Sequence, residues 1–278
     1  MKGRLTKILT TRIAKFNQKS FIKKIDFDNI FSSRLSNISI HTLCGEKQSI
    51  DLLYSILSFF SANGKPLKWV IYDDGTLTND TKCNLQRIPD IQIKSLKDIN
   101  PFLPKEILDL YPTLWKIEIM CSQIHSTTSM FSDSDIVYFS SFESKGIDVY
   151  KENYYLIDEG MGYFDSSYYR FRKKQFPPLN LGCIILNHFK LDWSPIFNYI
   201  IRLYKNGLLS YWSDQTAMDQ FAIENHFKAL PSEYFVVGGN DSFKVNHCCD
   251  YDKIALRHFV GPVRHKMWQY SWKKVLGV

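Results

Sequence analysis

Residues 37–72 read NISIHTLCGEKQSIDLLYSILSFFSANGKPLKWVIY, and three successive patterns divide this segment. A β-branched and apolar run over residues 37–45 ends at a glycine and predicts a strand. Apolar residues then recur at helical spacing over residues 48–60, until an Asn-Gly pair closes the helix. Residues 67–72 predict a second strand. Strand, helix and strand at this spacing form one βαβ unit, which implies a parallel sheet.

The remainder of the chain continues with weaker signals of the same kind. We expect strands at 91–93, 132–139, 179–186 and 234–237, and helices at 113–125 and 213–226. Neither an internal repeat nor a low-complexity linker interrupts the sequence, and 278 residues are enough for one large domain. The expected fold is therefore α/β, a single domain over residues 37–278 whose central mixed, mostly parallel sheet is flanked by helices.

The first 36 residues differ from the rest in charge. The net charge of the chain is +7, and residues 1–24 contain eight basic side chains and no acid. We interpret residues 1–36 as a basic arm or helix that either lies on anionic lipid or stays solvated or bound to a partner. Nucleic acid is not an expected partner, since no known reader motif accompanies the arm.

Other features of the sequence concern location. No run approaches the ~18 consecutive apolar residues of a membrane span. No secretory signal is recognisable, and no two cysteines have zinc-type C-x-x-C spacing. The expected location is the cytoplasm, with peripheral contact to the inner face of the membrane through the basic arm as one option.

Acidic residues stand at the ends of two predicted strands. Asp133-Ser134-Asp135 precedes an apolar run, and Asp73-Asp74 follows the strand at 67–72. Because residues two apart in an extended segment point the same way, the first group can hold two carboxylates against one hard cation. A solvated turn is the alternative, since Asp-x-Asp occurs by chance in many loops. Ligands of open α/β sheets bind outside the carboxyl ends of the strands, so both groups and Gly45 converge in principle on one crevice.

Four local patterns, in the same order along the chain, resemble those of GT-A-type glycosyltransferases. The resemblance is closest to the retaining enzymes of glycosyltransferase family 8 and to related bacterial enzymes that build envelope glycans. The patterns are the Asp-x-Asp motif at 131–137, the Asn-x-Gly strand at 180–187, the Asp-Gln helix start at 213–215, and the His-Phe-x-Gly tail at 258–261 followed by 266–268. The resemblance covers residues 38–268 and implies a GT-A, Rossmann-like fold. Leu181 and Met267 depart from the family's small residue and proline, and the tail has two extra residues between Gly261 and Lys266.

The resemblance implies a metal site and a group beside the reacting carbon. Asp133, Asp135 and His258 would hold Mn²⁺ or Mg²⁺ behind the departing diphosphate. The alternative for His258 is a loop histidine packed on aromatic rings. Asp214 and Gln215 would lie beside the anomeric carbon, as catalytic or sugar-positioning residues. Otherwise Asp214 or the serine before it caps a helix.

The resemblance also implies contacts to the nucleotide-sugar donor. The positions assigned to the donor are Thr42, Leu43 and Cys44 at the base, Asp74 at the base or ribose, and Lys116, Ser134, Asn180, Gly182, Gly261 and Lys266 along the diphosphate and sugar. Lys266 would lie over the diphosphate, with Arg264 as its rival and a solvated basic face as the alternative. Asp73 and Asp74 could instead cap a turn.

Two segments between these motifs are open to more than one interpretation. The loop that begins at Asp158 either shapes the acceptor site or is only a turn. The tyrosine-rich and basic residues 163–174 face either an anionic acceptor, such as a lipid-linked or phosphorylated glycan, or solvent.

The function expected from these features is metal-dependent transfer of a sugar from a nucleoside-diphosphate-sugar, a UDP-sugar by the family pattern, to a glycan or lipid-linked glycan, with retention. One alternative is a sugar-nucleotide nucleotidyltransferase, against which the single glycine after the first predicted strand argues. The other is a non-catalytic carbohydrate-binding protein. Release of pyrophosphate would indicate the first alternative, and donor binding without turnover would indicate the second.

Overall fold

The computed structural model describes residues 35–123, 128–158, 164–165, 168, 172, 176–187, 191–237, 250–261 and 263–267. All but the last two residues of the predicted basic arm lie outside the described residues, as does most of the segment 163–174. Within the described part of the chain, no helix combines the length and hydrophobicity that a bilayer crossing requires.

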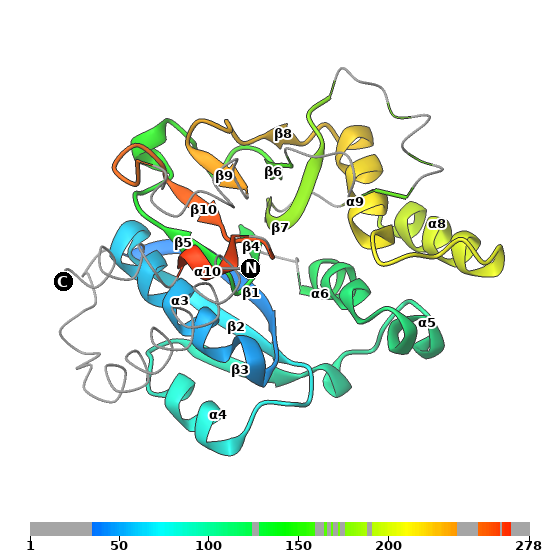
Figure 1. The fold of residues 1–278 in the computed structure, drawn as a ribbon, viewed down its shortest axis with the longest axis horizontal. Helices are drawn as coiled ribbons and strands as arrows, with labels where there is room; N and C mark the ends of the chain where they lie inside the picture. Colours follow the sequence, from blue (N-terminus) through cyan, green and yellow to red (C-terminus); the bar gives the residue numbers. More distant parts are fainter. Residues whose placement is uncertain are drawn as a thin grey trace, which may run out of the picture.

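Seven strands form the central sheet (Figure 1). They are β1 (Leu35–Cys44), β2 (Lys65–Asp73), β3 (Ile91–Ser95), β4 (Ser129–Ser132), β6 (Tyr154–Ile157), β7 (Leu179–Leu186) and β8 (Lys228–Ala229). Their order across the sheet is β3-β2-β1-β4-β7-β6-β8. β7 runs antiparallel to both of its neighbours, whereas the other pairs are parallel. The expected mixed, mostly parallel sheet is confirmed.

Helices cover both faces of this sheet. α3 (Ser49–Asn63) and α4 (Asn79–Gln86) pack on one face, where Ile56 and Leu85 join the same apolar cluster as Trp69 of β2. The opposite face carries α5 (Lys105–Leu110), α6 (Trp115–Gln123), α8 (Ser194–Lys205) and α9 (Ser213–Glu224), which gather at the right of Figure 1. Short 3₁₀ turns lie at Glu46–Gln48, Leu96–Asp98, Pro112–Leu114 and Glu143–Lys145.

A second, three-stranded sheet has the order β5-β10-β9, where β5 is Ile136–Tyr138, β9 is Phe235–Val237 and β10 is Leu256–His258. The extended segment expected over 132–139 is therefore divided between two sheets. β4 ends at Ser132 in the central sheet, and β5 begins at Ile136 in the small sheet, after three intervening residues. The Asp-Ser-Asp segment between them carries the chain from one sheet to the other, which explains why the run is not continuous. A short helix, α10 (Arg264–Lys266), follows β10.

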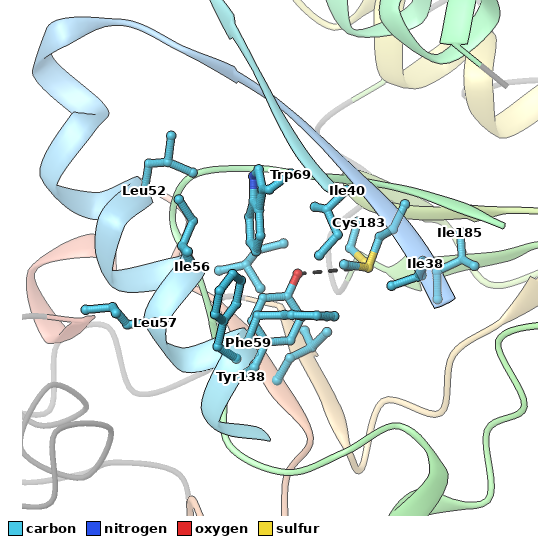
Figure 2. Packing of buried hydrophobic residues seen from close by; sticks show 14 of the residues in the cluster. Ile38, Ile40, Leu52, Ile56, Leu57, Phe59, Trp69, Tyr138, Cys183 and Ile185 are labelled. Atoms are coloured by element: carbon cyan, nitrogen blue, oxygen red, sulfur yellow. Dashed lines mark hydrogen bonds between the residues drawn. The ribbon is translucent and has the colours of Figure 1, made fainter. Parts of the chain in front are cut away.

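Aromatic rings pack α3 between the two sheets. Phe59 of α3 meets Trp69 edge-on at 5.8 Å between centroids and Tyr138 of β5 at 5.0 Å (Figure 2). The backbone N–H of Tyr138 also donates to the hydroxyl of Ser58, at 3.0 Å. α3 therefore fixes the small sheet against the central one.

We expect Phe59→Ala to lower the free energy of unfolding by about 3–5 kcal/mol, because it leaves a cavity beside two fully buried rings. The exposed Leu67 of β2 offers the control, since Leu67→Ala should change stability by less than about 0.5 kcal/mol. Urea denaturation measures both. Equal effects of the two substitutions would contradict the packing described.

Candidate active site

Backbone hydrogen bonds to both sheets hold the segment that contains Asp133 and Asp135. Asp133 N–H donates to the carbonyl of Gly182 on β7 at 2.7 Å. Phe259 N–H, just after β10, donates to the carbonyl of Asp135 at 2.9 Å. Asp135 is buried and Asp133 half-buried, so the segment is not the solvated turn that was the alternative.

His258 joins these acids because β10 pairs with β5 in antiparallel register, which sets His258 opposite Ile136. Its Nε2 lies 3.1 Å from Asp135 Oδ1 and 3.7 Å from Asp133 Oδ2. One ligand atom from each of the three residues lies within 4.8 Å of the others. The alternative of a loop histidine packed on aromatic rings does not describe this position.

The hydrogen bonds of Asn180 define the tautomer of His258. Asn180 Oδ1 accepts from Gly182 N–H at 3.0 Å, and the same atom lies 2.8 Å from His258 Nδ1, which must therefore donate. Nε2 faces the two carboxylates, so one imidazole nitrogen and two carboxylate groups converge on one position. This set of donors fits a divalent metal ion, and a hydrogen bond from the other ring nitrogen is the usual support of a metal-bound histidine.

Gly182 makes this arrangement possible. A Cβ atom at Gly182 would lie 2.2 Å from Cε1 and 2.3 Å from Nδ1 of His258. The imidazole therefore occupies the space that any other residue would fill at this position of β7. The predicted role of Gly182 was close approach of the sugar, and the structure adds close approach of the histidine.

Two basic side chains neutralise the acids. Lys116 Nζ of α6 lies 2.7 Å from both carboxylate oxygens of Asp133. Arg264 Nε of α10 lies 3.0 Å from Asp135 Oδ2, which also accepts from Arg264 Nη2. Burial alone would raise the pKa of Asp135, but His258 and Arg264 hold it well below its usual range. Asp135 is thus an anion at neutral pH.

Arg264, the expected rival of Lys266, contacts the Asp-x-Asp segment through Asp135. Lys266 is 1% exposed, within α10, and its predicted position over the diphosphate stays a prediction. Gly261 lies in the turn before that helix. The spacing of the tail was the signal for Arg264. If Arg264 rather than Lys266 takes the place of the family's basic residue, the distance from Gly261 matches the family pattern, with no extra residues between them.

A second polar network lies beside the first. Asp158, at the end of β6, accepts a hydrogen bond from Asn180 Nδ2 at 3.0 Å and has the amide of Gln215 at 3.5 Å. Asn180 thereby links Asp158 and Gln215 to His258. In the sequence, Asp158 is distinguished only as an acidic residue before a glycine-bearing loop, so its connection to this site was missed.

Asp214 is the second residue of α9 and is buried. Its carboxylate accepts from the N–H of Gln215 at 2.7 Å and from the side chain of Thr113. Burial raises the pKa of Asp214 to about 6, although the positive charge of Lys116 opposes the rise. Ser213 does not cap the helix with its side chain, because its hydroxyl donates to Asp165 Oδ2 at 3.0 Å.

The predicted base-binding residues stand at the ends of β1 and β2. The Thr42 hydroxyl faces the core and accepts from Trp69 Nε1 at 3.1 Å, so only backbone is available there. Asp73 caps the turn after β2, accepting from Gly75 N–H at 2.8 Å, and pairs with Lys82. Asp74 also bonds within this turn, as one alternative expected, but its side chain stays exposed.

Leu43, Cys44 and Ser134 complete the predicted set. Leu43 is half-buried, and Cys44 is buried next to Gly45. The Cys44 carbonyl accepts from Asp74 N–H at 3.1 Å, which ties the two strand ends together. Ser134 is buried between the two aspartates. The structure thus assembles one cluster around Asp133 and Asp135, and a second group at the ends of β1 and β2.

The architecture is that of the glycosyltransferases with a GT-A-like fold. The structure of the galactosyltransferase LgtC, solved with donor and acceptor sugar analogues, matches with a TM-score of 0.59 and 14% identity, over 86% of this chain and 95% of that one. Mouse xyloside xylosyltransferase 1 matches with a TM-score of 0.51 and 11% identity, over 83% of this chain and 99% of that one. The glycosyltransferase GlyE of Streptococcus pneumoniae matches with a TM-score of 0.54 and 12% identity, over 87% of this chain and 62% of that one.

Comparisons based on sequence find no related protein family and no related curated protein. At the identities of the structural matches, what is shared is the fold. The GT-A-like fold expected from the four sequence patterns is confirmed.

Gly182→Ala should displace the His258 ring and destabilise the protein by about 1–3 kcal/mol, because the new methyl group overlaps the imidazole. Gly261→Ala is the control for stability, since a Cβ there meets no atom within 4 Å. Thermal and urea denaturation measure both variants. If the two variants prove equally stable, His258 is not held against β7.

Stability should also depend on the protonation of Asp214. Its pKa rises on folding from 3.8 to about 6, so the folded protein binds more protons than the unfolded chain between these values. This group therefore contributes stability at low pH that is lost as the pH rises towards about 6. We expect the stability of the wild type, relative to Asp214→Asn, to fall over that interval in denaturation at several pH values. A difference that stays constant with pH would contradict the raised pKa.

Proposed function

We propose that this chain is a metal-dependent glycosyltransferase that moves a sugar from a nucleoside-diphosphate-sugar to a glycan or lipid-linked glycan. The observation that carries the proposal is the meeting of Asp133, Asp135 and His258 within 4.8 Å, at the carboxyl end of a strand of a GT-A-like sheet. Donor diphosphates need charge neutralisation at this edge of such a sheet.

Asp133, Asp135 and His258 would hold the metal ion, which when bound supplies Lewis-acid stabilisation of the diphosphate leaving group. A set that mixes carboxylates with an imidazole suits Mn²⁺ better than Mg²⁺, which prefers oxygen ligands throughout. Lys116 and Arg264 orient the two carboxylates. The 45% exposed side chain of Arg264 is available to a phosphate oxygen.

The nucleoside would lie at the ends of β1 and β2. Thr42, Leu43 and Cys44 would meet the base through their backbone, and the exposed carboxylate of Asp74 would accept hydrogen bonds from ribose or base. Backbone hydrogen bonding at a strand end suits a flat pyrimidine ring, and the family pattern favours a UDP-sugar. Ser134, Gly261 and Lys266 would line the diphosphate.

Asp214 and Gln215 would lie beside the anomeric carbon. Above pH 6 a buried Asp214 is an anion, which stabilises positive charge that develops on the sugar ring. Asp158 and Asn180 position the Gln215 amide through the network already described. Transfer with retention of configuration follows from the family pattern.

The acceptor and the location belong to the same proposal. A glycan or glycolipid acceptor would be met at the cytoplasmic face of the membrane. The eight basic side chains of residues 1–24 would draw the enzyme to anionic lipid there.

Asp135→Asn should abolish release of nucleoside diphosphate, with a loss of at least about 10²-fold, because it removes one carboxylate from the metal and from its neighbours. The assay measures free UDP from a panel of UDP-sugars with Mn²⁺, with and without chelator. Asp80→Asn, in the exposed first turn of α4, is the matched control and should retain wild-type activity.

Three results would contradict the proposal. Full activity in excess chelator would exclude a metal, and full activity of Asp135→Asn would exclude this site. Pyrophosphate as the product would indicate a nucleotidyltransferase.

A further inference from the structure

Each aspartate of the site is shared between the candidate metal position and a fixed positive charge. Lys116 Nζ lies 2.7 Å from both oxygens of Asp133. Arg264 binds Asp135 Oδ2 through Nε at 3.0 Å and through Nη2, while Asp135 Oδ1 faces His258 at 3.1 Å. A divalent ion bound among these residues must compete with Lys116 and Arg264 for the same two carboxylates.

Each carboxylate of the Asp-x-Asp segment already has a cation as its partner. An ion that enters while both contacts persist places two more positive charges next to Lys116 and Arg264, in a largely buried site. Burying uncompensated charge is costly. One of the basic side chains therefore has to leave its carboxylate, or metal binding remains weak.

The two basic side chains differ in how readily they can leave. Lys116 projects from α6, has a side chain that is 19% exposed, and lies over the Phe131 ring at 5.8 Å from its centroid. The Arg264 side chain is 45% exposed and belongs to a helix of three residues. Because the Arg264 side chain is already partly in solvent, it loses fewer buried contacts than Lys116 when it moves away from its carboxylate. Arg264 is therefore the residue expected to move.

We propose that Arg264 competes with the divalent ion for Asp135, and that it is released from this carboxylate when the ion binds. The inference rests on the proposed function, in which the ion and a diphosphate share the site. Arg264 thus weakens binding of the metal alone. When a nucleoside diphosphate is present, the released guanidinium gains a new anionic partner, so metal and nucleotide bind with positive coupling.

Titration of the full chain with Mn²⁺, followed by electron paramagnetic resonance of the free ion, tests the competition without any turnover. Arg264→Gln should bind Mn²⁺ about tenfold more tightly than the wild type, since a charge-assisted contact no longer opposes the ion. Arg264→Met, which keeps the length of the side chain, should give the same gain. Arg202→Gln, an exposed arginine on α8, is the matched control and should bind as the wild type does.

A second measurement tests the coupling. Calorimetry with UDP as the probe, at zero and at saturating Mn²⁺, gives the factor by which the metal strengthens nucleotide binding. That factor should be larger in the wild type than in Arg264→Gln. Melting temperatures of all variants establish that they are folded.

The outcomes separate this inference from the proposed function. Equal or weaker Mn²⁺ binding by folded Arg264→Gln and Arg264→Met, with a wild type that binds the ion, overturns the competition and leaves the metal site intact. If neither the wild type nor any of the variants binds Mn²⁺, the metal site itself is overturned, and the competition with it.

Discussion

The antiparallel register between β5 and β10 is the constraint on which the rest of the site depends. It sets His258 opposite Ile136, the residue that directly follows Asp135, although His258 and Asp135 are 123 residues apart in the chain. Backbone hydrogen bonds from Phe259 to Asp135, and from Asp133 to β7, then hold the link between the two sheets from both sides. A slip of one residue in this register would turn the imidazole to the opposite face.

This constraint produces a site that is organised before a ligand arrives. The Gly182 position admits the imidazole, Asn180 sets its tautomer, and Asp158 holds the other end of the Asn180 amide. Side chains fixed by their own hydrogen bonds lose little freedom when they bind a ligand. The contacts of Lys116 and Arg264 with the two carboxylates stabilise the cluster, and the same contacts oppose entry of a further cation.

Local patterns in the sequence were enough to predict much of this molecule. The helix after the first strand and the strand at 179–186 were predicted because apolar periodicity is a local property. The helical spacing of Ile196, Ile200 and Leu203 is the same signal for α8, a helix that was not among those predicted. The division into two sheets could not be predicted, because β5 and β10 have three residues each, and Leu256 of β10 pairs with Tyr138 of β5, 118 positions away in the chain (256 − 138). The contact of Arg264 with Asp135 needed the structure for a similar reason, since the two residues are far apart in the chain and meet only through the fold.

The most direct test is diffraction from crystals that contain Mn²⁺, with data collected at the manganese absorption edge to locate the ion. The account predicts one anomalous peak whose protein ligands are Asp133, Asp135 and His258. A peak with other ligands, or the absence of a peak at this position at saturating Mn²⁺, would contradict it.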